Sequence, residues 1–120
     1  WLMVNPNYTS INVEAQEKDP DSVLSFYKEL IALRKNPAYK ETLVYGEVIP
    51  YLEEQHNLMA YHRKGEKDLL VIGNFQKDPQ TVQLPSSCRN VLLDNYKDLE
   101  LDKEASTVHL KGYQAIVVEL

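Results

Sequence analysis

The chain has 120 residues, which is enough for one compact core and too few for two full domains when the elements are one helix and a run of strands. Hydrophobic residues make up 43% and charged residues 26% of the sequence, a composition that excludes an intrinsically disordered chain. The formal net charge is −5 and Lys and Arg are scattered, which argues against a nucleic acid or an anionic membrane as partner, because both require a basic surface.

Residues 1–18 show no helical or strand period, and we predict an ordered loop. Pro6 and several asparagines indicate turns, while apolar residues spaced along the segment indicate that it is held against a surface. The chain begins with Trp1 rather than Met, so we expect it to be the C-terminal piece of a longer protein. Since the sequence contains neither a membrane span nor a signal pattern, a cytoplasmic location is the default expectation.

The pattern that follows predicts one helix, running from Asp19 to Lys35. Asp19 is a suitable N-cap, because its carboxylate can accept from free backbone N–H groups, and Pro20 suits the first helical position. Asn36 can take the left-handed capping conformation and Pro37 disfavours helical geometry in its predecessor, so the helix should end within a residue or two of Lys35.

Apolar residues cover about half of this predicted helix, a face broad enough to require a large partner surface. Arg34 projects from the middle of that face, so we expect its stem to pack and its guanidinium to find a carboxylate or a carbonyl near the helix end. The face comprises Val23, Leu24, Phe26, Tyr27, Leu30, Ile31 and Leu33.

After Pro37 the period changes to that of short strands separated by turns, which indicates an all-β module. Residues 69–72 are apolar at every position, as in a central strand that is buried on both faces. Residues 64–67 and the pair Lys111 and Gly112 are predicted reversals. The predicted strands are residues 44–52, 58–63, 69–75, 81–84, 90–94, 107–110 and 113–120.

No catalytic or metal-binding constellation is evident. The three histidines lie in or beside different strands and Cys88 is the single cysteine, so we predict no metal site, no cofactor and no disulfide. The acidic stretch 97–106 is interpreted as a solvated loop because it has no tight calcium-loop spacing. Glu53 and Glu54 are adjacent acids at a predicted hairpin turn, where a solvated tip is the simpler interpretation than a glycosidase pair.

The first 39 residues resemble the stretch that ends the catalytic barrel of glycoside hydrolase family 13. The family pattern has the form PWxxVNPNYxxINVExQxxDPDSVxx(Y)YxxLIxLRK, and the resemblance lies in its oligo-1,6-glucosidase, dextran glucosidase, trehalose-6-phosphate hydrolase and α-glucosidase branch. Residues 44–46 (VYG), 58–63 (LMAYHR) and 70–75 (LVIGNF) also resemble the strands of the C-terminal domain in that branch. The resemblance therefore extends over nearly the whole chain.

The resemblance implies a fold: an antiparallel Greek-key β-sandwich, preceded by one amphipathic helix that belongs to a (β/α)8 barrel absent from this chain. It divides the chain into residues 1–37, the end of the barrel, and residues 38–120, the C-terminal β-sandwich domain. The helix from Asp19 to Lys35 would join the sandwich to the enzyme's own barrel. With that barrel absent, part of the apolar helix face should be exposed and the chain should self-associate.

The family enzymes are retaining α-glucosidases, whose catalytic carboxylates lie on barrel strands that precede Trp1, so the resemblance implies no catalytic residue in this chain. Asn5, Asn7 and Tyr8 fall on the loop side of the barrel, where active sites lie. They are therefore either substrate-binding residues near the sugar-binding mouth or an asparagine-proline turn that wraps the barrel edge.

The resemblance favours a noncatalytic, stabilising fragment of an α-glucosidase that hydrolyses α-1,6 or α-1,4 bonds of short oligosaccharides. Linkage specificity, phosphorylated against neutral substrates, and hydrolysis against isomerisation all remain open at this point. The rival hypothesis is a freestanding carbohydrate-binding β-sandwich, which would bind maltose or isomaltose oligomers. An immunoglobulin-like interaction module is disfavoured, because it gives the helix and the loop at Asn5 to Tyr8 no role.

Overall fold

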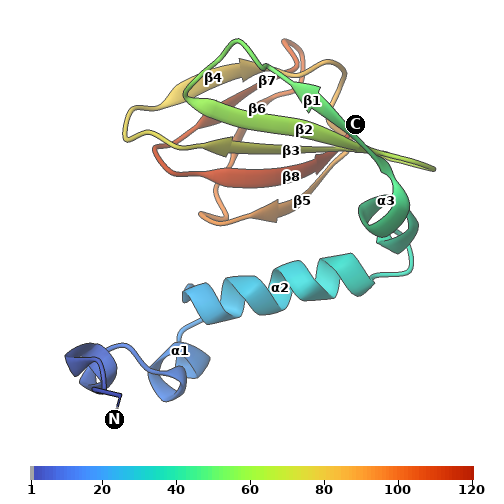
Figure 1. Cartoon of the computed structure of the whole chain (residues 1–120). Coiled ribbons are helices and arrows are strands. Elements are labelled where there is room, and N and C mark those ends of the chain that lie inside the picture. The colour runs from blue at the N-terminus through green and yellow to red at the C-terminus, as the bar shows by residue number, and fades with distance from the viewer. Residues whose placement is uncertain (1) are drawn as a thin grey trace.

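The computed structural model describes residues 2–120, and Trp1, the first residue of the family pattern in this sequence, lies outside the described residues. The chain forms two visibly different parts, a β-sandwich and a helical arm of residues 2–45 that runs beneath it (Figure 1). The molecule measures 52 × 35 × 26 Å along its principal axes, and the arm accounts for its elongation.

The sandwich contains two antiparallel sheets, which confirms the predicted mainly β, Greek-key architecture. The larger sheet has the order β1-β2-β3-β8-β5, formed by β1 (Glu47–Tyr51), β2 (Leu58–Lys64), β3 (Asp68–Asn74), β8 (Ala115–Glu119) and β5 (Asn90–Asp94). The smaller sheet has the order β4-β7-β6, formed by β4 (Gln80–Gln83), β7 (Thr107–Leu110) and β6 (Glu100–Asp102). The chain therefore crosses between sheets after β3, β4, β5 and β7.

The core lies between the two sheets and is built by the period-2 alternation of the strands. Leu70 and Ile72 of β3 point inward beside Ile116 and Val118 of β8, and all four are almost completely excluded from solvent. Leu69 is equally buried on the opposite face of β3, which agrees with the prediction of a central strand covered on both sides. Successive side chains on a strand point to opposite faces, so this one strand contributes to two packed layers.

The prediction of a loop over residues 1–18 is wrong in detail, because the segment contains a 3-10 helix, η1 (Pro6–Thr9), and a short helix, α1 (Val13–Lys18). Asn5 and Asn12 are the N-caps: Asn5 Oδ1 accepts from the backbone N–H of Asn7 at 3.0 Å and Asn12 Oδ1 from that of Ala15 at 2.8 Å. These elements have four and six residues, too few to produce a readable period.

Helix α2 (Val23–Lys35) starts later than predicted. Ser22 is the N-cap, its Oγ accepting from the Ser25 N–H at 3.2 Å, whereas Asp19 caps a preceding turn by accepting from the Asp21 N–H at 2.9 Å. The predicted end at Lys35 is confirmed, although Asn36 has φ −62° and is not left-handed. Asn36 instead accepts from the N–H of Ala38 and turns the chain into α3.

Two further predictions fail at short elements. Residues 44 and 45 belong to a helix, α3 (Lys40–Tyr45), so the first strand begins only at Glu47. Gly46 separates the two elements where a Cβ would collide with the carbonyl oxygens of Thr42 and Lys64. The acidic stretch 97–106, predicted to be a loop throughout, contains the three-residue strand β6 that pairs with β7.

Candidate functional site

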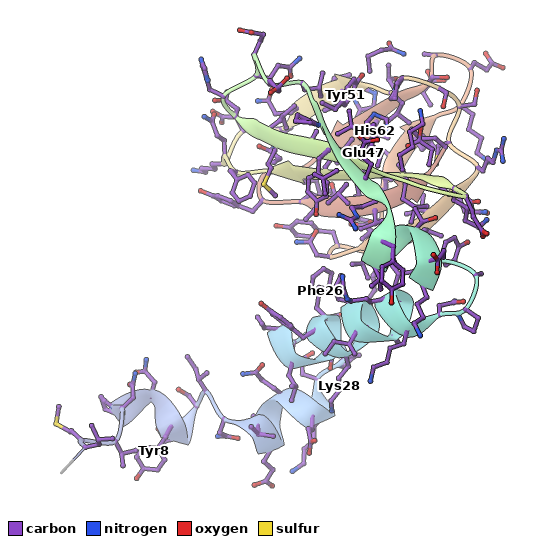
Figure 2. All side chains as sticks on the ribbon, turned by 45° about the vertical axis from the view of Figure 1, so that its right-hand side comes forward. Tyr8, Phe26, Lys28, Glu47, Tyr51 and His62 are labelled. Carbon is purple, nitrogen blue, oxygen red and sulfur yellow. The ribbon has the colours of Figure 1, made fainter. Side chains whose placement is uncertain are left out.

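Asn7 and Tyr8 lie in η1 and Asn5 is its N-cap, at the end of the arm farthest from the sandwich (Figures 1 and 2). With Val4 and Ile11 they line a shallow concavity of about 230 Å³. The Tyr8 ring is 60% exposed, and in Figure 2 it points away from the sandwich. The Asn5 side-chain oxygen caps η1, and Asn5, Asn7 and Tyr8 are all exposed.

Asn12 is a residue of this segment that we did not single out as a site candidate. Its amide nitrogen donates to the Tyr8 carbonyl at 3.0 Å, while its oxygen caps α1. A single side chain therefore fixes η1 against α1, and with it the position of Tyr8. An Asn immediately before the apolar residue that starts a helix is the signal that could have identified it.

The apolar face of α2 has a half-buried part and an exposed part. Phe26 and Leu33 are half-buried, and Figure 2 shows Phe26 pointing toward the sandwich while Lys28 points to the other side. By contrast Val23, Tyr27 and Ile31, spaced four residues apart along one side of the helix, are 68%, 58% and 48% exposed. Such an exposed apolar stripe is typical of a surface that packs against another part of a protein.

A groove of about 570 Å³ separates α2 and α3 from the outer face of the larger sheet. Apolar side chains line it, among them Leu30, Leu33, Val71 and Val117. Two arginines complete the wall. Arg34 Nη1 donates to the Leu43 carbonyl at 3.4 Å, and this confirms that Arg34 meets a carbonyl near the helix end. Arg63 Nη2 donates to the same carbonyl oxygen at 3.1 Å.

Polar contacts fasten the arm to the sandwich at both ends of α2. At its start, Lys97 Nζ lies 3.0 Å from Asp21 Oδ1 and 3.7 Å from Glu29 Oε1, and the hydrogen bond to Asp21 raises the pKa of Lys97. At the other end, beyond α2, the Tyr39 hydroxyl donates to the Glu119 carboxylate at 3.2 Å, and within the sandwich that carboxylate also accepts from Lys67 Nζ at 2.6 Å. The arm is thus held by one exposed ionic contact and by one part-buried hydrogen bond to a charged group.

Glu119 is the centre of the buried contact, since the residue is only 5% exposed. Its other oxygen accepts from Asn90 Nδ2 at 2.8 Å and from the hydroxyl of Tyr39 at 3.2 Å, which brings the start of α3 to β8. Hydrogen bonds from Lys67 and then Asn90 hold the pKa of Glu119 below its ordinary value. Burial and the Glu119 charge raise the pKa of Tyr39, and the hydrogen bond to Glu119 raises that of Lys67.

The remaining chemistry-bearing residues are dispersed. His62 Nδ1 lies 2.6 Å from Asp68 Oδ1, beneath the edge of the Tyr51 ring, inside the sandwich. Burial raises the pKa of the Cys88 thiol, which disfavours the reactive thiolate. Within residues 2–120 no group of three His, Cys, Asp or Glu side chains is arranged to hold a metal ion, and no helix there is long and apolar enough to cross a membrane.

Comparison with known families divides the chain into two matched stretches. Residues 1–46 match the family described as alpha amylase, catalytic domain. Residues 58–117 match the family described as alpha-amylase SusG C-terminal domain. The first stretch therefore ends at Gly46, the glycine between α3 and β1, and the second covers β2 to β7 and the first three residues of β8.

Curated relatives match across the whole chain. The probable oligo-1,6-glucosidase 2 of Bacillus subtilis is 43% identical over 87% of this chain and 19% of its own length. The oligo-1,6-glucosidase of Bacillus cereus is 38% identical over 100% of this chain and 22% of its own length. The chain thus spans about a fifth of the length of the curated relatives that it matches.

Solved structures give the same placement. The isomaltulose synthase of Klebsiella sp. LX3 superposes with a TM-score of 0.88 at 32% identity, covering 99% of this chain and 21% of that one. The trehalulose synthase of Pseudomonas mesoacidophila MX-45 superposes with a TM-score of 0.89 at 30% identity, with the same coverage. This chain therefore belongs to the alpha-amylase family, glycoside hydrolase family 13, and corresponds to the last barrel helix and the C-terminal β-domain of that family's oligo-1,6-glucosidase branch.

Proposed function

We propose that this chain is the noncatalytic, stabilising C-terminal part of an α-glucosidase that hydrolyses α-1,6 or α-1,4 bonds of short oligosaccharides by a retaining mechanism. In this proposal residues 1–37 complete the catalytic barrel and residues 38–120 form the supporting sandwich. The chain itself would be inactive, since the residues of the retaining mechanism lie on barrel strands outside it. Hydrolysis of α-1,6 bonds is favoured over isomerisation because the curated relatives at 35–43% identity are named oligo-1,6-glucosidases.

The exposed stripe of Val23, Tyr27 and Ile31 is the observation that carries the proposal. These side chains belong to a well-formed helix, yet the sandwich leaves them 48–68% exposed. The stretch that contains them matches a catalytic domain, and Figure 2 shows Phe26, which is not part of the stripe, pointing toward the sandwich. A stripe of this kind stabilises the protein only when a second surface covers it, and we assign that surface to the barrel.

Asn7 and Tyr8 are proposed to face the sugar-binding side of the parent enzyme, with Asn5 holding their backbone in place. The exposed Tyr8 ring and the shallow concavity beside it support this assignment. An aromatic ring can stack on the apolar face of a pyranose while its hydroxyl remains hydrogen-bonded to water. Substitution of Asn5 would then act through loss of the cap on η1, whereas substitution of Tyr8 would act on the substrate directly.

A hybrid enzyme tests the supporting role. This chain would replace the matched C-terminal part of the Bacillus cereus oligo-1,6-glucosidase, and the control would be that enzyme cut before the residues equivalent to 38–120. We expect the hybrid to retain isomaltose hydrolysis and to melt cooperatively at a higher temperature than the truncated control. A hybrid that is no more stable or active than the truncated enzyme would contradict the proposal.

Binding calorimetry on the isolated chain distinguishes the rival carbohydrate-binding module. A supporting domain should show no heat of binding with isomaltose or maltotriose, whereas a binding module should show a saturable one. Hydrolysis of isomaltose by the isolated chain is also expected to be absent. Saturable binding by the isolated chain would favour the rival hypothesis over ours.

Self-association of the isolated chain is a further expectation, because two copies can cover each other's apolar stripes. Sedimentation velocity should show concentration-dependent oligomers, and Tyr27→Lys should shift them toward the monomer by adding charge to the stripe. Lys28→Met is the matched control, since Lys28 lies on the same helix but outside the stripe. Its Nζ lies 3.4 Å from Glu17 Oε1. A chain that remains monomeric at high concentration would count against an uncovered partner surface.

A further inference from the structure

The groove between the arm and the larger sheet contains two positive charges and no negative charge to balance them. Arg34 and Arg63 both line it, and their guanidinium groups share one acceptor, the carbonyl oxygen of Leu43. The lining contains no acidic side chain. Within residues 2–120 the Nε of Arg63 is buried and has no hydrogen-bond acceptor. A buried guanidinium N–H without an acceptor is unfavourable, and because Arg63 lines the groove, the accessible part of its guanidinium is where an incoming acceptor would bind.

The shape and charge of the groove specify what would fit. Apolar side chains from α2, α3 and the sheet form most of the wall, so the inserted group must include an apolar side chain. The planar guanidinium presents its donors in a fork that matches the two oxygens of a carboxylate. A carbonyl alone could accept from one guanidinium N–H, but only a carboxylate would also balance two neighbouring positive charges.

We propose that this groove receives a segment of the catalytic domain that inserts an apolar side chain and places an Asp or Glu carboxylate against Arg63, with Arg34 beside it. The inference rests on the proposed function, in which the chain supports a barrel. One wall of the groove is α2, which lies in the stretch that matches a catalytic domain. A segment that packs beside α2 in that domain therefore reaches the groove directly. Arg63, on strand β2 of the sandwich, then forms an ion pair with a carboxylate of the catalytic domain.

Zero-length cross-linking in the hybrid enzyme tests the contact. Arg63→Lys introduces an amine at this position, and a water-soluble carbodiimide condenses an amine with a carboxylate only when the two are in contact. Peptide mass spectrometry should identify an amide between the introduced lysine and an Asp or Glu of the catalytic portion. A link within this chain, a link to a second copy, or no link in an active hybrid would each overturn the inference.

A stability comparison supplies a second measurement. Arg63→Met should lower the melting temperature of the hybrid by several degrees more than that of the isolated chain, because only the hybrid loses an ion pair with a partner. Arg89→Met is the matched control, since the exposed Arg89 lies outside the groove and should leave both melting temperatures nearly unchanged. Equal effects of Arg63→Met in the two proteins would overturn the inference. A stable, active hybrid in that case would leave the proposed function intact.

Discussion

The sandwich and the helical arm are stabilised in different ways, although one continuous chain forms both. The sandwich encloses its own apolar residues: Leu70, Ile72 and Val108 are essentially inaccessible to solvent. Helices η1, α1 and α2 bury none of their residues, and local caps together with a few ionic contacts hold them in place. The sandwich can therefore account for its own stability, whereas much of the apolar surface of the arm remains exposed.

Removing apolar volume from each part should give the largest contrast. Leu70→Ala deletes a fully buried side chain between the sheets and should lower the free energy of unfolding by about 2–5 kcal/mol. Val23→Ala, on the exposed stripe, should change it by no more than about 0.5 kcal/mol. Urea unfolding of the isolated chain, followed by circular dichroism, measures both. Similar losses for the two variants would remove the distinction between the parts.

The junction between the parts is sensitive to a single methyl group. Gly46→Ala places a Cβ against the backbone carbonyls of Thr42 and Lys64, so the junction must shift, at a cost of about 1–3 kcal/mol. Gly65→Ala is the control, because its Cβ would meet the Thr42 Oγ1 at 3.2 Å, a contact that a small side-chain movement relieves. Thermal unfolding of the two variants gives the comparison, and a larger effect at Gly65 would contradict it.

The buried contact at Glu119 should make the attachment of the arm sensitive to pH. Because the folded-state pKa of Glu119 is depressed below its ordinary value of 4.5, its stabilisation is present above that value and is lost as the pH falls through the folded-state pKa. Glu119→Gln should cost about 1–2 kcal/mol at pH 7 and should flatten the fall in stability below pH 4.5. Unfolding measured between pH 7 and pH 3 tests this; an unchanged slope in the variant would contradict it.

The exposed ionic contact at the other end of α2 should matter least. Lys97→Met removes the pairs with Asp21 and Glu29, and we expect the smallest loss of stability among these variants because solvent screens exposed charges. Added salt should reduce the difference from the unmodified chain. Hydrogen exchange at the start of α2 is the sensitive measurement. A loss as large as that from Glu119→Gln would show that the two attachments are equivalent after all.

Sequence reasoning succeeded for two strands of the sandwich and for the end of the long helix. Residues 90–94 and 107–110 are strands with the predicted bounds, and the end of α2 at Lys35 was also correct. It failed at short elements whose residue types do not match their structure. The six residues of α3 overlap a β-like run, and β6 has only three residues in an acidic stretch, so neither offers a readable period.

The candidate site was only partly predictable for the same reason. The position of Asn5, Asn7 and Tyr8 on one loop follows from their adjacency, but whether they contact substrate is a prediction that still requires the parent enzyme. The capping role of Asn12 is local and could have been identified from its place before α1. The meeting of Arg34 with Arg63 could not, because it depends on how a helix and a sheet far apart in sequence lie against each other.

The order of strands in the larger sheet also determines when the protein can fold during its synthesis. Strand β8 lies between β3 and β5, so β5 has no neighbour in its sheet until residues 115–119 have been made. Until then one edge of β3 is unpaired. The arm and the strands β1 to β3 are therefore synthesised before β8, the strand that completes their sheet. The helix that corresponds to the last barrel helix therefore emerges before the sandwich can form, and final assembly must wait for β8.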